Sequence, residues 1–458
     1  MVKVLHLSDI HLGSGLAHGR INPETGLNTR LEDLTATLGR CIDRAISEPV
    51  DLVIFGGDAF PDATPPPLHR DAFARQFVRL AEANIPTVLL VGNHDQHGQG
   101  QEGTSLSIYR TLGVSGFYVG DRLRTRLIDT RGGPVQVTTL PWLNRSTLLT
   151  RPEMEGLTGE AISAKLLQRL DLALEAETRQ LDADMPAILL VHAMVDTARY
   201  GAERHLAVGK GFTVPLSLLA RSAYQYVALG HVHKHQVLCD DPPVVYPGSI
   251  ERVDFSEERE TKGFVLAEVT TDSAAYEFVP LDVRRFVTVR VDLTESPDLT
   301  AAEREAGPTD ENAKLASPTD RLLQAIAKAD ISDCIARLIY RIRADIADEV
   351  DVNALHAALA DASSYAIHPD VVAPARLHLP GLAASDLDPI DALELYLQTR
   401  QDLAGLQADM LTAARALVAQ AEVDAEEVGE FDFEATVETP SAYVATSEQL
   451  SLWTEPAG

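Results

Sequence analysis

Five short polar motifs follow predicted strands in the first half of the sequence, and they carry carboxylate, amide and imidazole side chains. The residues concerned are Asp9 and His11, then Asp58, then Asn93 with His94 and Asp95, then His192, and finally His231 with His233. Each motif stands at the carboxyl end of a predicted strand, where the sites of open α/β sheets assemble. A single histidine after a strand is more often structural, so the prediction of one shared site depends on the ordered set.

The mixture of ligand types indicates which metals such a site would bind. Carboxylate, amide and imidazole ligands together suit divalent transition metals, whereas Mg²⁺ and Ca²⁺ sites are nearly all oxygen. Seven candidate ligands are more than one ion needs, and they suit two ions that share a bridging carboxylate. Two ions about 3.5–4 Å apart bind the attacking and leaving oxygens of a phosphoryl displacement and activate water near neutral pH. The predicted reaction is therefore the hydrolysis of phosphate esters.

The elements that must position these residues are predicted from hydrophobic periodicity. Strand-like runs occupy residues 2–7, 51–55, 87–91, 135–140, 188–191 and 226–229, with closing strands at 244–246 and 263–269. Residues 30–47 and 68–83 repeat apolar side chains every three or four positions, which is typical of helices packed on a sheet. We predict an α/β domain over residues 1–283, with helices layered against sheets.

A second, smaller α+β domain is predicted over residues 284–372. A strand at 286–293, a helix at 320–329 and a strand at 334–342 flank a polar, aperiodic excursion at 294–319. Pro369, Pro374 and Pro380 mark a linker, so residues 373–421 are predicted to form a linker and a partner-binding helix. That helix spans 386–421, and its apolar stripe comprises Leu403, Leu406, Met410, Ala413 and Leu417. The acidic residues 422–458 are predicted to be disordered.

The composition excludes several classes of protein. The 458 residues contain no apolar run long enough to span a bilayer and begin with no signal peptide. Cys41, Cys239 and Cys334 form neither a disulfide framework nor a zinc motif, which favours a cytoplasmic protein. The net charge of −29 opposes non-specific binding of nucleic acid. A nucleic-acid substrate would therefore require bound metal, a local basic patch or a cationic partner.

The order of the five motifs resembles the calcineurin-like metallophosphoesterase superfamily over about residues 1–270. Within it, the chain is similar to the SbcD group of nuclease subunits. The supporting residues are 7–13 (Leu-Ser-Asp-Ile-His-Leu-Gly), Asp58 followed by 64–66 (Thr-Pro-Pro), 246–249 (Tyr-Pro-Gly-Ser) and 262–264 (Lys-Gly-Phe). The resemblance implies a four-layer β-sandwich flanked by helices, with a small α+β capping domain and a C-terminal helical segment.

The resemblance also implies a role for each motif residue. The first ion would be held by Asp9, His11, Asp58 and His233, and the second by Asp58, Asn93, His192 and His231. Asp58 would bridge the two ions, which the resemblance implies are Mn²⁺. His94 would approach the scissile phosphate or the leaving oxygen, and Asp95 would orient His94.

Some positions near the motifs do not fit the family pattern or are ambiguous. Relatives often have Asp or His three residues after the bridging aspartate, where this chain has Pro61, and Asp62 is a candidate replacement. His97 and His235 are interpreted as surface or supporting histidines. The loop 14–30, which contains Arg20, Asn22, Asn28 and Arg30, either lines a substrate groove or is an ordinary surface loop.

The leading functional hypothesis is a metal-dependent DNA nuclease, exonuclease or endonuclease, that acts with an SbcC-type ATPase in DNA end processing, repair and recombination. DNA and that ATPase are the expected partners, a homodimer is a further assembly to test, and no membrane is involved. The alternative is a small-molecule phosphodiesterase or phosphatase with the same metals. The additional domain and C-terminal helix favour the nuclease. A non-enzymatic scaffold is disfavoured because every expected ligand position is filled.

Overall fold

Two six-stranded β-sheets form the body of the N-terminal part of the chain. A computed structural model describes residues 1–96, 103–143, 156–201, 213–294, 317–372, 388–398, 403 and 405–427. The first sheet has the order β14 (Ala274–Pro280), β13 (Gly263–Val269), β1 (Val2–Leu7), β2 (Leu52–Phe55), β3 (Thr87–Leu90) and β4 (Phe117–Gly120). Strands β1 to β4 are parallel, whereas β13 pairs antiparallel with both β1 and β14. The carboxyl ends of β1, β2 and β3 therefore lie at one edge of the sheet.

The second sheet repeats this arrangement. Its order is β11 (Gln236–Asp240), β12 (Pro243–Tyr246), β10 (Tyr226–Gly230), β7 (Ala187–His192), β6 (Val135–Leu140) and β5 (Arg124–Ile128). Strands β12, β10, β7 and β6 are parallel, and the two edge strands are antiparallel to their neighbours. The carboxyl ends of β7 and β10 are consequently neighbours, as those of β1 and β2 are in the first sheet.

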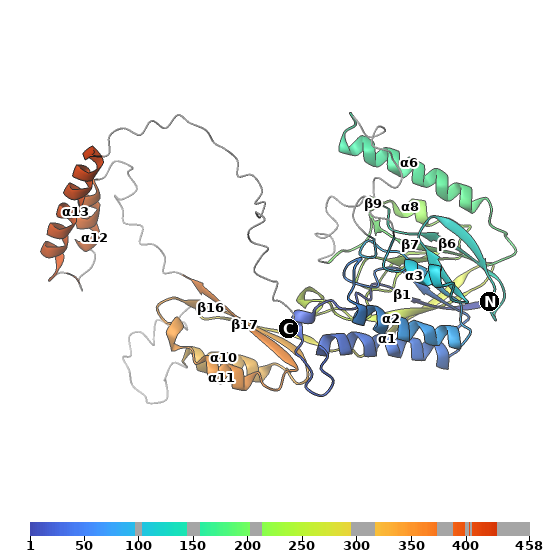
Figure 1. The fold of residues 1–458 in the computed structure, drawn as a ribbon, viewed down its shortest axis with the longest axis horizontal. Helices are drawn as coiled ribbons and strands as arrows, with labels where there is room; N and C mark the ends of the chain where they lie inside the picture. The colour runs from blue at the N-terminus through green and yellow to red at the C-terminus, as the bar shows by residue number, and fades with distance from the viewer. Residues whose placement is uncertain are drawn as a thin grey trace, which may run out of the picture. The chain divides into compact units, whose positions relative to one another are not determined.

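The two sheets pack face to face and carry helices on their outer faces (Figure 1). Val4 and Ile54 of the first sheet share one buried cluster with Ile188 and Tyr226 of the second. The outer face of the first sheet is covered by α1 (Thr29–Ser47) and α2 (Pro67–Glu82), and that of the second by α6 (Gly159–Thr178) and α8 (Leu216–Leu219). The four layers confirm the predicted fold class.

Helix α1 illustrates how the sequence specifies these layers. Asn28 precedes the helix, and its side chain accepts a hydrogen bond from the backbone N–H of Arg30, which is a standard N-cap. Its buried apolar residues recur every three or four positions, namely Leu31, Leu34, Leu38, Cys41, Ile42 and Ala45. This spacing places them on one face of the helix, where they pack on the first sheet.

Several short elements were absent from the sequence-based prediction. They are α3 (Ser107–Leu112), the strands β8 (Met194–Val195) and β9 (Thr213–Val214), and the 3₁₀ helices η1 (Leu16–His18) and η2 (Phe255–Glu257). Strands β4, β5, β11 and β14 and helices α6 and α8 were not predicted either. Most of these elements are short or lie at sheet edges, where hydrophobic periodicity is weak.

A small α+β region, which we call the cap, follows the sandwich. Its three-stranded parallel sheet comprises β15 (Phe286–Asp292), β16 (Ile335–Arg343) and β17 (Ser364–Val372). The cap also contains α10 (Pro318–Lys328), η3 (Ala347–Glu349) and α11 (Val352–Ala358). Pro369 was predicted to begin a linker, but it lies inside β17 opposite Tyr340. Strand β17 is an edge strand, and a proline without an N–H is tolerated there.

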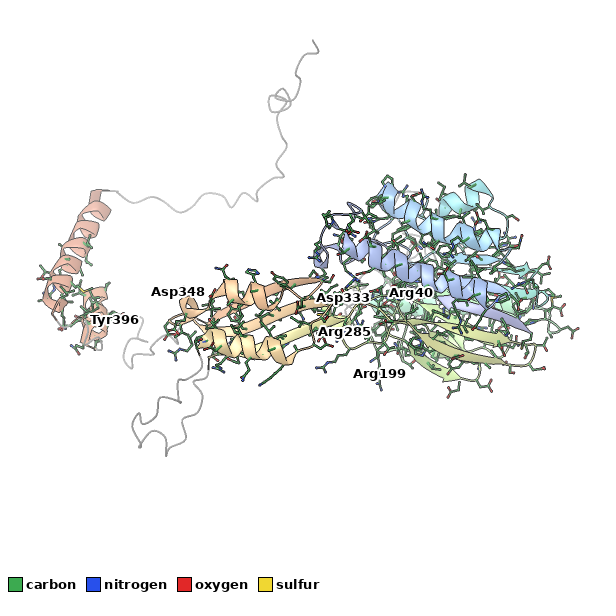
Figure 2. All side chains as sticks on the ribbon, turned by 90° about the horizontal axis from the view of Figure 1, so that it is seen from below. Arg40, Arg199, Arg285, Asp333, Asp348 and Tyr396 are labelled. Carbon is green, nitrogen blue, oxygen red and sulfur yellow. The ribbon has the colours of Figure 1, made fainter. Side chains whose placement is uncertain are left out.

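The cap belongs to one compact unit with the sandwich, over residues 1–374, and the remaining residues form a second unit. Figure 2 shows Arg285 and Asp333 where the cap meets the sandwich. Arg40 of α1 lines the same hollow as these two residues. Most of the predicted excursion, residues 295–316, lies outside the described residues. Helix α10 begins immediately afterwards, with a capping box at Ser317.

The second unit contains two helices rather than the single helix predicted over 386–421. Helices α12 (Pro389–Gln398) and α13 (Gln407–Glu427) pack against each other, with Leu397 buried (Figure 1). Gly405 lies two residues before α13, and glycine is a poor helix former. Of the predicted stripe, Leu403 and Leu406 precede α13, whereas Met410, Ala413 and Leu417 lie in it.

Part of the predicted disordered segment 422–458 is helical. Helix α13 continues through residue 427, so the prediction of disorder is wrong for residues 422–427. Residues 428–458 lie outside the described residues. Among the residues that the structure does describe, no helix is long and apolar enough to cross a membrane.

Candidate metal centre

The five predicted motifs meet where the carboxyl ends of the two sheets converge. Asp9 and His11 follow β1, Asp58 follows β2, and Asn93, His94 and Asp95 follow β3; His192 ends β7, and His231 and His233 follow β10. At this edge the backbone of one sheet is in contact with the backbone of the other. A Cβ atom on Gly230 would lie 2.2 Å from the carbonyl oxygen of Gly56, so a larger residue would force the strand ends apart.

The backbone of several candidate ligands is held in the left-handed region. The φ angles are 52° at Asp9, 45° at His11, 60° at Asp58 and 109° at His231. These account for four of the six non-glycine residues with positive φ in the described chain. Such conformations cost about 1–3 kcal/mol each and cluster at functional sites, where the surrounding structure enforces them. Their concentration here indicates that backbone strain, which lowers the stability of the fold, is tolerated because it places these side chains.

The first group of ligand atoms comes from Asp9, His11 and His233, whose donor atoms lie within 4.8 Å of one another. The Nε2 atoms of His11 and His233 face each other at 3.0 Å. The Asp9 carboxylate accepts hydrogen bonds from the Ser8 hydroxyl at 2.5 Å and from the backbone N–H of His231 at 3.1 Å. A cation between the two rings would satisfy both imidazole lone pairs and the adjacent carboxylate.

The second group comprises Asp58, His192 and His231, again with donor atoms within 4.8 Å. The Oδ1 atom of Asn93 lies 3.0 Å from Nε2 of His192 and 2.9 Å from Nδ1 of His231. Nε2 of His231 is buried and has no hydrogen-bond partner. The Asn93 oxygen, Nε2 of His192 and Nδ1 of His231 converge beside Asp58, which makes this group a second candidate metal subsite.

Asp58 lies between the two groups. Its Oδ2 atom is 3.7 Å from Nε2 of His11 and 3.4 Å from Nε2 of His192. Its Oδ1 atom accepts a hydrogen bond from the backbone N–H of His94 at 2.8 Å. The donor set therefore fits two divalent ions with Asp58 between them, as the resemblance implied. The assignment of individual ligands to ions stays a prediction.

Burial and mutual charge set the protonation of these groups. Burial alone would raise the pKa of Asp58, but the adjacent His192 ring holds it well below its usual range. Burial alone would lower the pKa of His192, but nearby carboxylates, Asp58 foremost, raise it to about 9. Burial, reinforced by His233, lowers the pKa of His11 to about 3. His11 is therefore neutral and ready to bind metal, whereas His192 must first release a proton.

The prediction that Asp95 orients His94 is wrong. Nδ1 of His94 lies 2.7 Å from the carbonyl oxygen of Pro61, so it donates to that backbone atom. Pro61 stands where relatives carry a polar side chain, and here its main chain positions the histidine. This leaves Nε2 of His94 as the ring nitrogen available to a substrate. Asp62 instead accepts two hydrogen bonds from Thr64 in a local turn.

Asp95 holds the loop that carries Asp58. Its Oδ2 atom accepts from the backbone N–H groups of Asp58 at 2.9 Å and Gly92 at 3.0 Å. Its Oδ1 atom accepts from the N–H of Ala59 and the hydroxyl of Ser105. Burial, reinforced by the Asp58 charge, raises the pKa of Asp95 to about 6. Asp95 therefore contributes to the site through the backbone around Asp58.

Most polar residues in the loop 14–30 have structural roles. Asn28 caps α1, Asn22 donates to Glu32, and Arg30 is buried in ion pairs with Asp33 and Glu251. The groove-lining interpretation therefore fails for these three residues, because their polar groups are already engaged.

The two remaining histidines have different outcomes. His235 stacks on Phe278 with ring centroids 4.0 Å apart and bonds the carbonyl of Tyr246, and neither of these partners is a predicted metal ligand. His97 lies outside the described residues.

Three residues of the site were missed. The Trp142 ring packs 4.9 Å from that of His231 and forms a wall of the second subsite. Glu257 bonds Nδ1 of His233, and buried Lys262 pairs with Glu257. In the sequence, Lys262 is distinguished only as part of the motif 262–264, which resembles the SbcD group. Glu257 stands among several acidic residues, so no spacing distinguished it.

Residues 2–235 match the calcineurin-like phosphoesterase family, which is half of the chain and includes all nine predicted site residues. The chain belongs to this family. It is therefore a phosphoesterase-type hydrolase by family, and its described residues include groups that could hold metal ions.

Individual relatives are more distant. The chain is 27% identical over 303 residues to the uncharacterized metallophosphoesterase YhaO of Bacillus subtilis, a match that covers 65% of this chain and 64% of that protein. TT1561 of Thermus thermophilus is 16% identical with a TM-score of 0.35, over 60% of this chain and 98% of that chain. A dimetal phosphatase from Danio rerio is 13% identical with a TM-score of 0.34, over the same shares of the two chains.

Proposed function

We propose that this phosphoesterase is a DNA nuclease that hydrolyses phosphodiester bonds with two Mn²⁺ ions and acts with an SbcC-type ATPase in DNA end processing in the cytoplasm. The observation that carries the proposal is the contact of the cap with the 3₁₀ helices η1 and η2, beside the predicted metal ligands. The Ser364 hydroxyl donates to the carbonyl of His18, and the hydroxyl of Thr288 donates to Glu258 at 2.6 Å. A separate domain bordering the centre suits an extended substrate better than a small one.

Each group of the site has a role in this proposal. Two divalent ions, when bound, would activate a water and neutralise charge on the phosphoryl oxygens. Mn²⁺ accepts the mixture of carboxylate, amide and imidazole donors found here. His94, whose Nδ1–H donates to the Pro61 carbonyl, presents Nε2 to the leaving oxygen, and as the imidazolium it can donate the Nε2 proton to that oxygen. Trp142 packs against His231 and shields that side of the centre from water.

A row of arginines near the centre supports a polyanionic substrate. Arg124 and Arg126 lie on one face of the edge strand β5, and Arg122 stands two residues before the strand, paired with Asp121 at 3.4 Å. Burial and the charges of Arg124 and Arg122 lower the pKa of Arg126, which indicates that these cations are crowded. Strand β5 pairs with β6, and Trp142, two residues beyond β6, contacts His231. Cations at this sheet edge are the kind of local basic patch that an acidic nuclease requires.

The alternative function is a small-molecule phosphodiesterase or phosphatase that uses the same ions. The family membership and the metal-ligand groups fit it equally well. It leaves the cap and the second helical unit without a role.

The deciding experiment compares purified protein on linear duplex DNA and on a chromogenic phosphodiester, with and without Mn²⁺. The matched control is Asp58→Asn, which keeps the shape of the bridging side chain and removes its charge. We expect Mn²⁺-dependent cleavage of both substrates by the natural chain and of neither by the variant. Cleavage of the chromogenic substrate with intact DNA would instead establish the small-molecule alternative.

The second unit supports the proposed contact with the ATPase. Met410 and Leu417 of α13 are exposed, and Leu417 exposes 72% of its surface. The intermediate residues Leu411, Ala414 and Val418 form the adjacent face of the same helix. An exposed apolar row beside a partly covered face suits a helix that docks into a groove of another protein.

Co-purification with the SbcC-type ATPase tests this contact. A chain truncated after Leu379 retains the first compact unit and should keep Mn²⁺-dependent cleavage of simple substrates but lose the ATPase. In the full chain, Met410→Asp with Leu417→Asp should have the same effect, whereas Thr412→Asp on the opposite face should not. ATPase binding by the truncated chain would contradict the proposal.

A further inference from the structure

Glu257, at the end of the 3₁₀ helix η2, directly contacts a predicted metal ligand. Its side chain is buried, with 6% of the residue exposed, and its Oε1 atom lies 2.6 Å from Nδ1 of His233. A carboxylate at this position accepts the Nδ1 proton and leaves Nε2 of His233 as the metal-binding nitrogen. That Nε2 atom is the one that faces His11 at 3.0 Å.

A buried lysine holds Glu257 in this position. Nζ of Lys262 lies 2.7 Å from Oε2 of Glu257, 2.7 Å from a carboxylate oxygen of Glu260, and 3.1 Å from the carbonyl oxygen of His233. The second carboxylate oxygen of Glu257 also accepts from the N–H of Val253 at 3.1 Å. The side chain of Glu257 therefore has no freedom to leave His233 unless the η2 segment itself moves.

The other side of η2 is bound by the cap. The Phe255 ring packs edge-to-face on Phe286 with centroids 4.8 Å apart. The Arg337 guanidinium lies 4.1 Å from the centroid of the Phe255 ring. Glu258, the residue after η2, accepts from the hydroxyl of Thr288 at 2.6 Å and from its backbone N–H at 3.1 Å. Phe286, Thr288 and Arg337 all belong to the cap strands β15 and β16.

We propose that Glu257 is a positioning residue for His233, and that through η2 the seating of the cap sets the affinity of the Asp9, His11 and His233 subsite for its ion. The chain of contacts is short: cap strand, Glu258 and Phe255, Glu257, His233. A cap shifted by a bound substrate would displace η2 and change the orientation of one ligand ring. Glu257 bonds His233, which belongs to one subsite only, so we expect the larger effect on the ion held by Asp9, His11 and His233. The inference rests on the proposed two-ion centre.

The experiment measures Mn²⁺ binding to the full chain by titration calorimetry, with electron paramagnetic resonance to distinguish a coupled ion pair from a single ion. In Glu257→Gln, the carboxamide retains the shape but loses the charge that supports His233. We expect one of the two ions to bind about 10- to 100-fold more weakly, the effect typical of losing such a partner. The spectrum should change from coupled to single-ion at concentrations that still fill the other subsite.

Two further variants make the test specific. Glu260→Gln also loses a charge beside Lys262 but does not touch His233, and it should keep both ions. Thr288→Val, in the cap, removes the hydroxyl bond to Glu258 and should weaken the same single ion by about 2- to 10-fold, the factor of one hydrogen bond. Thermal unfolding of the metal-free variants serves to compare their folding.

Each outcome has a definite meaning. If the natural chain binds no pair of ions, the proposed two-ion centre fails. If it binds two and Glu257→Gln weakens neither, or both equally, the positioning role is overturned. A selective effect of Glu257→Gln with unchanged binding in Thr288→Val retains the positioning role and overturns the transmission from the cap.

Discussion

Removal of Arg30 should strongly destabilise the protein. Arg30 is 1% exposed, and its guanidinium contacts Asp33 at 2.8 Å, Glu251 at 3.1 Å and the carbonyl oxygen of Arg252 at 2.8 Å. Arg30→Met keeps an apolar stem and removes all three contacts. Asp33 would retain Arg284 at 2.8 and 2.9 Å, so its charge stays compensated.

Glu251 determines the magnitude of the loss. It is 2% exposed and, among the described residues, would keep the Thr37 hydroxyl, at 3.1 Å, as its side-chain hydrogen-bond partner. Removing one member of a buried ion pair costs about 3–5 kcal/mol, because the other charge stays buried without compensation. We therefore expect Arg30→Met to lower the free energy of unfolding by about 3–5 kcal/mol at pH 7.5. Replacing both residues, Arg30→Met with Glu251→Met, should recover at least half of this loss.

The deficit should also depend on pH in a defined direction. Burial raises the pKa of Glu251 even with Arg30 present, and without the arginine this pKa rises further. A carboxyl group with a raised pKa in the folded state gains stability as the pH falls through that pKa. The loss in Arg30→Met should thus be larger at pH 8 than at pH 5.5.

Urea unfolding followed by circular dichroism measures both effects. Arg75→Met, which removes a fully exposed ion pair with Asp71, is the control and should change little. A deficit for Arg30→Met below about 1 kcal/mol, or one that does not change with pH, would refute the view that this buried network is uncompensated without its arginine.

Three further predictions concern the metal centre. His94→Ala should retain both ions by metal analysis while the rate of hydrolysis falls about 10²- to 10⁴-fold, since a positioned proton donor is lost; loss of metal would make His94 a ligand. Gly92→Ala should impair metal binding and activity without unfolding the chain, because the added Cβ would lie 2.1 Å from Oδ1 of Asp58; unchanged metal content would show that the loop can yield. Because the pKa of His192 is raised to about 9, metal binding should release a proton and strengthen from pH 6.5 to 9, whereas the stability of the metal-free protein contributed by protonated His192 should decline over that window. Calorimetry in buffers of different ionisation enthalpy detects the proton, and its absence would contradict the assigned charge state.

Hydrophobic periodicity predicted the sheets well where strands are buried on both faces. The predicted strands 263–269 and 2–7 have the same bounds as β13 and β1, because most residues of both strands are buried. The C-terminal segment was predicted less well: one helix was expected over 386–421, whereas α12 and α13 lie there, and the apolar stripe residues Met410 and Leu417 are exposed. Spacing predicts which residues share a face, but it does not identify what covers that face.

The sequence likewise predicted some residues of the candidate site and not others. Residue types at strand ends were sufficient to bring Asp9, Asp58 and His192 into one prediction, because parallel strands align their carboxyl ends. Supporting contacts were not predictable, since they depend on backbone atoms and on segments distant in the sequence. Pro61 orients His94 through a carbonyl group that every residue possesses, and Glu257 reaches His233 across 24 positions.

The most direct test of the two-ion centre is a crystal structure of the Mn²⁺-loaded protein with anomalous diffraction recorded near the manganese edge. We expect two anomalous peaks about 3.5–4 Å apart on either side of the Asp58 carboxylate. One peak should lie among Asp9, His11 and His233, and the other among Asn93, His192 and His231. A single peak at full occupancy, or two peaks that do not share Asp58, would contradict the two-ion centre.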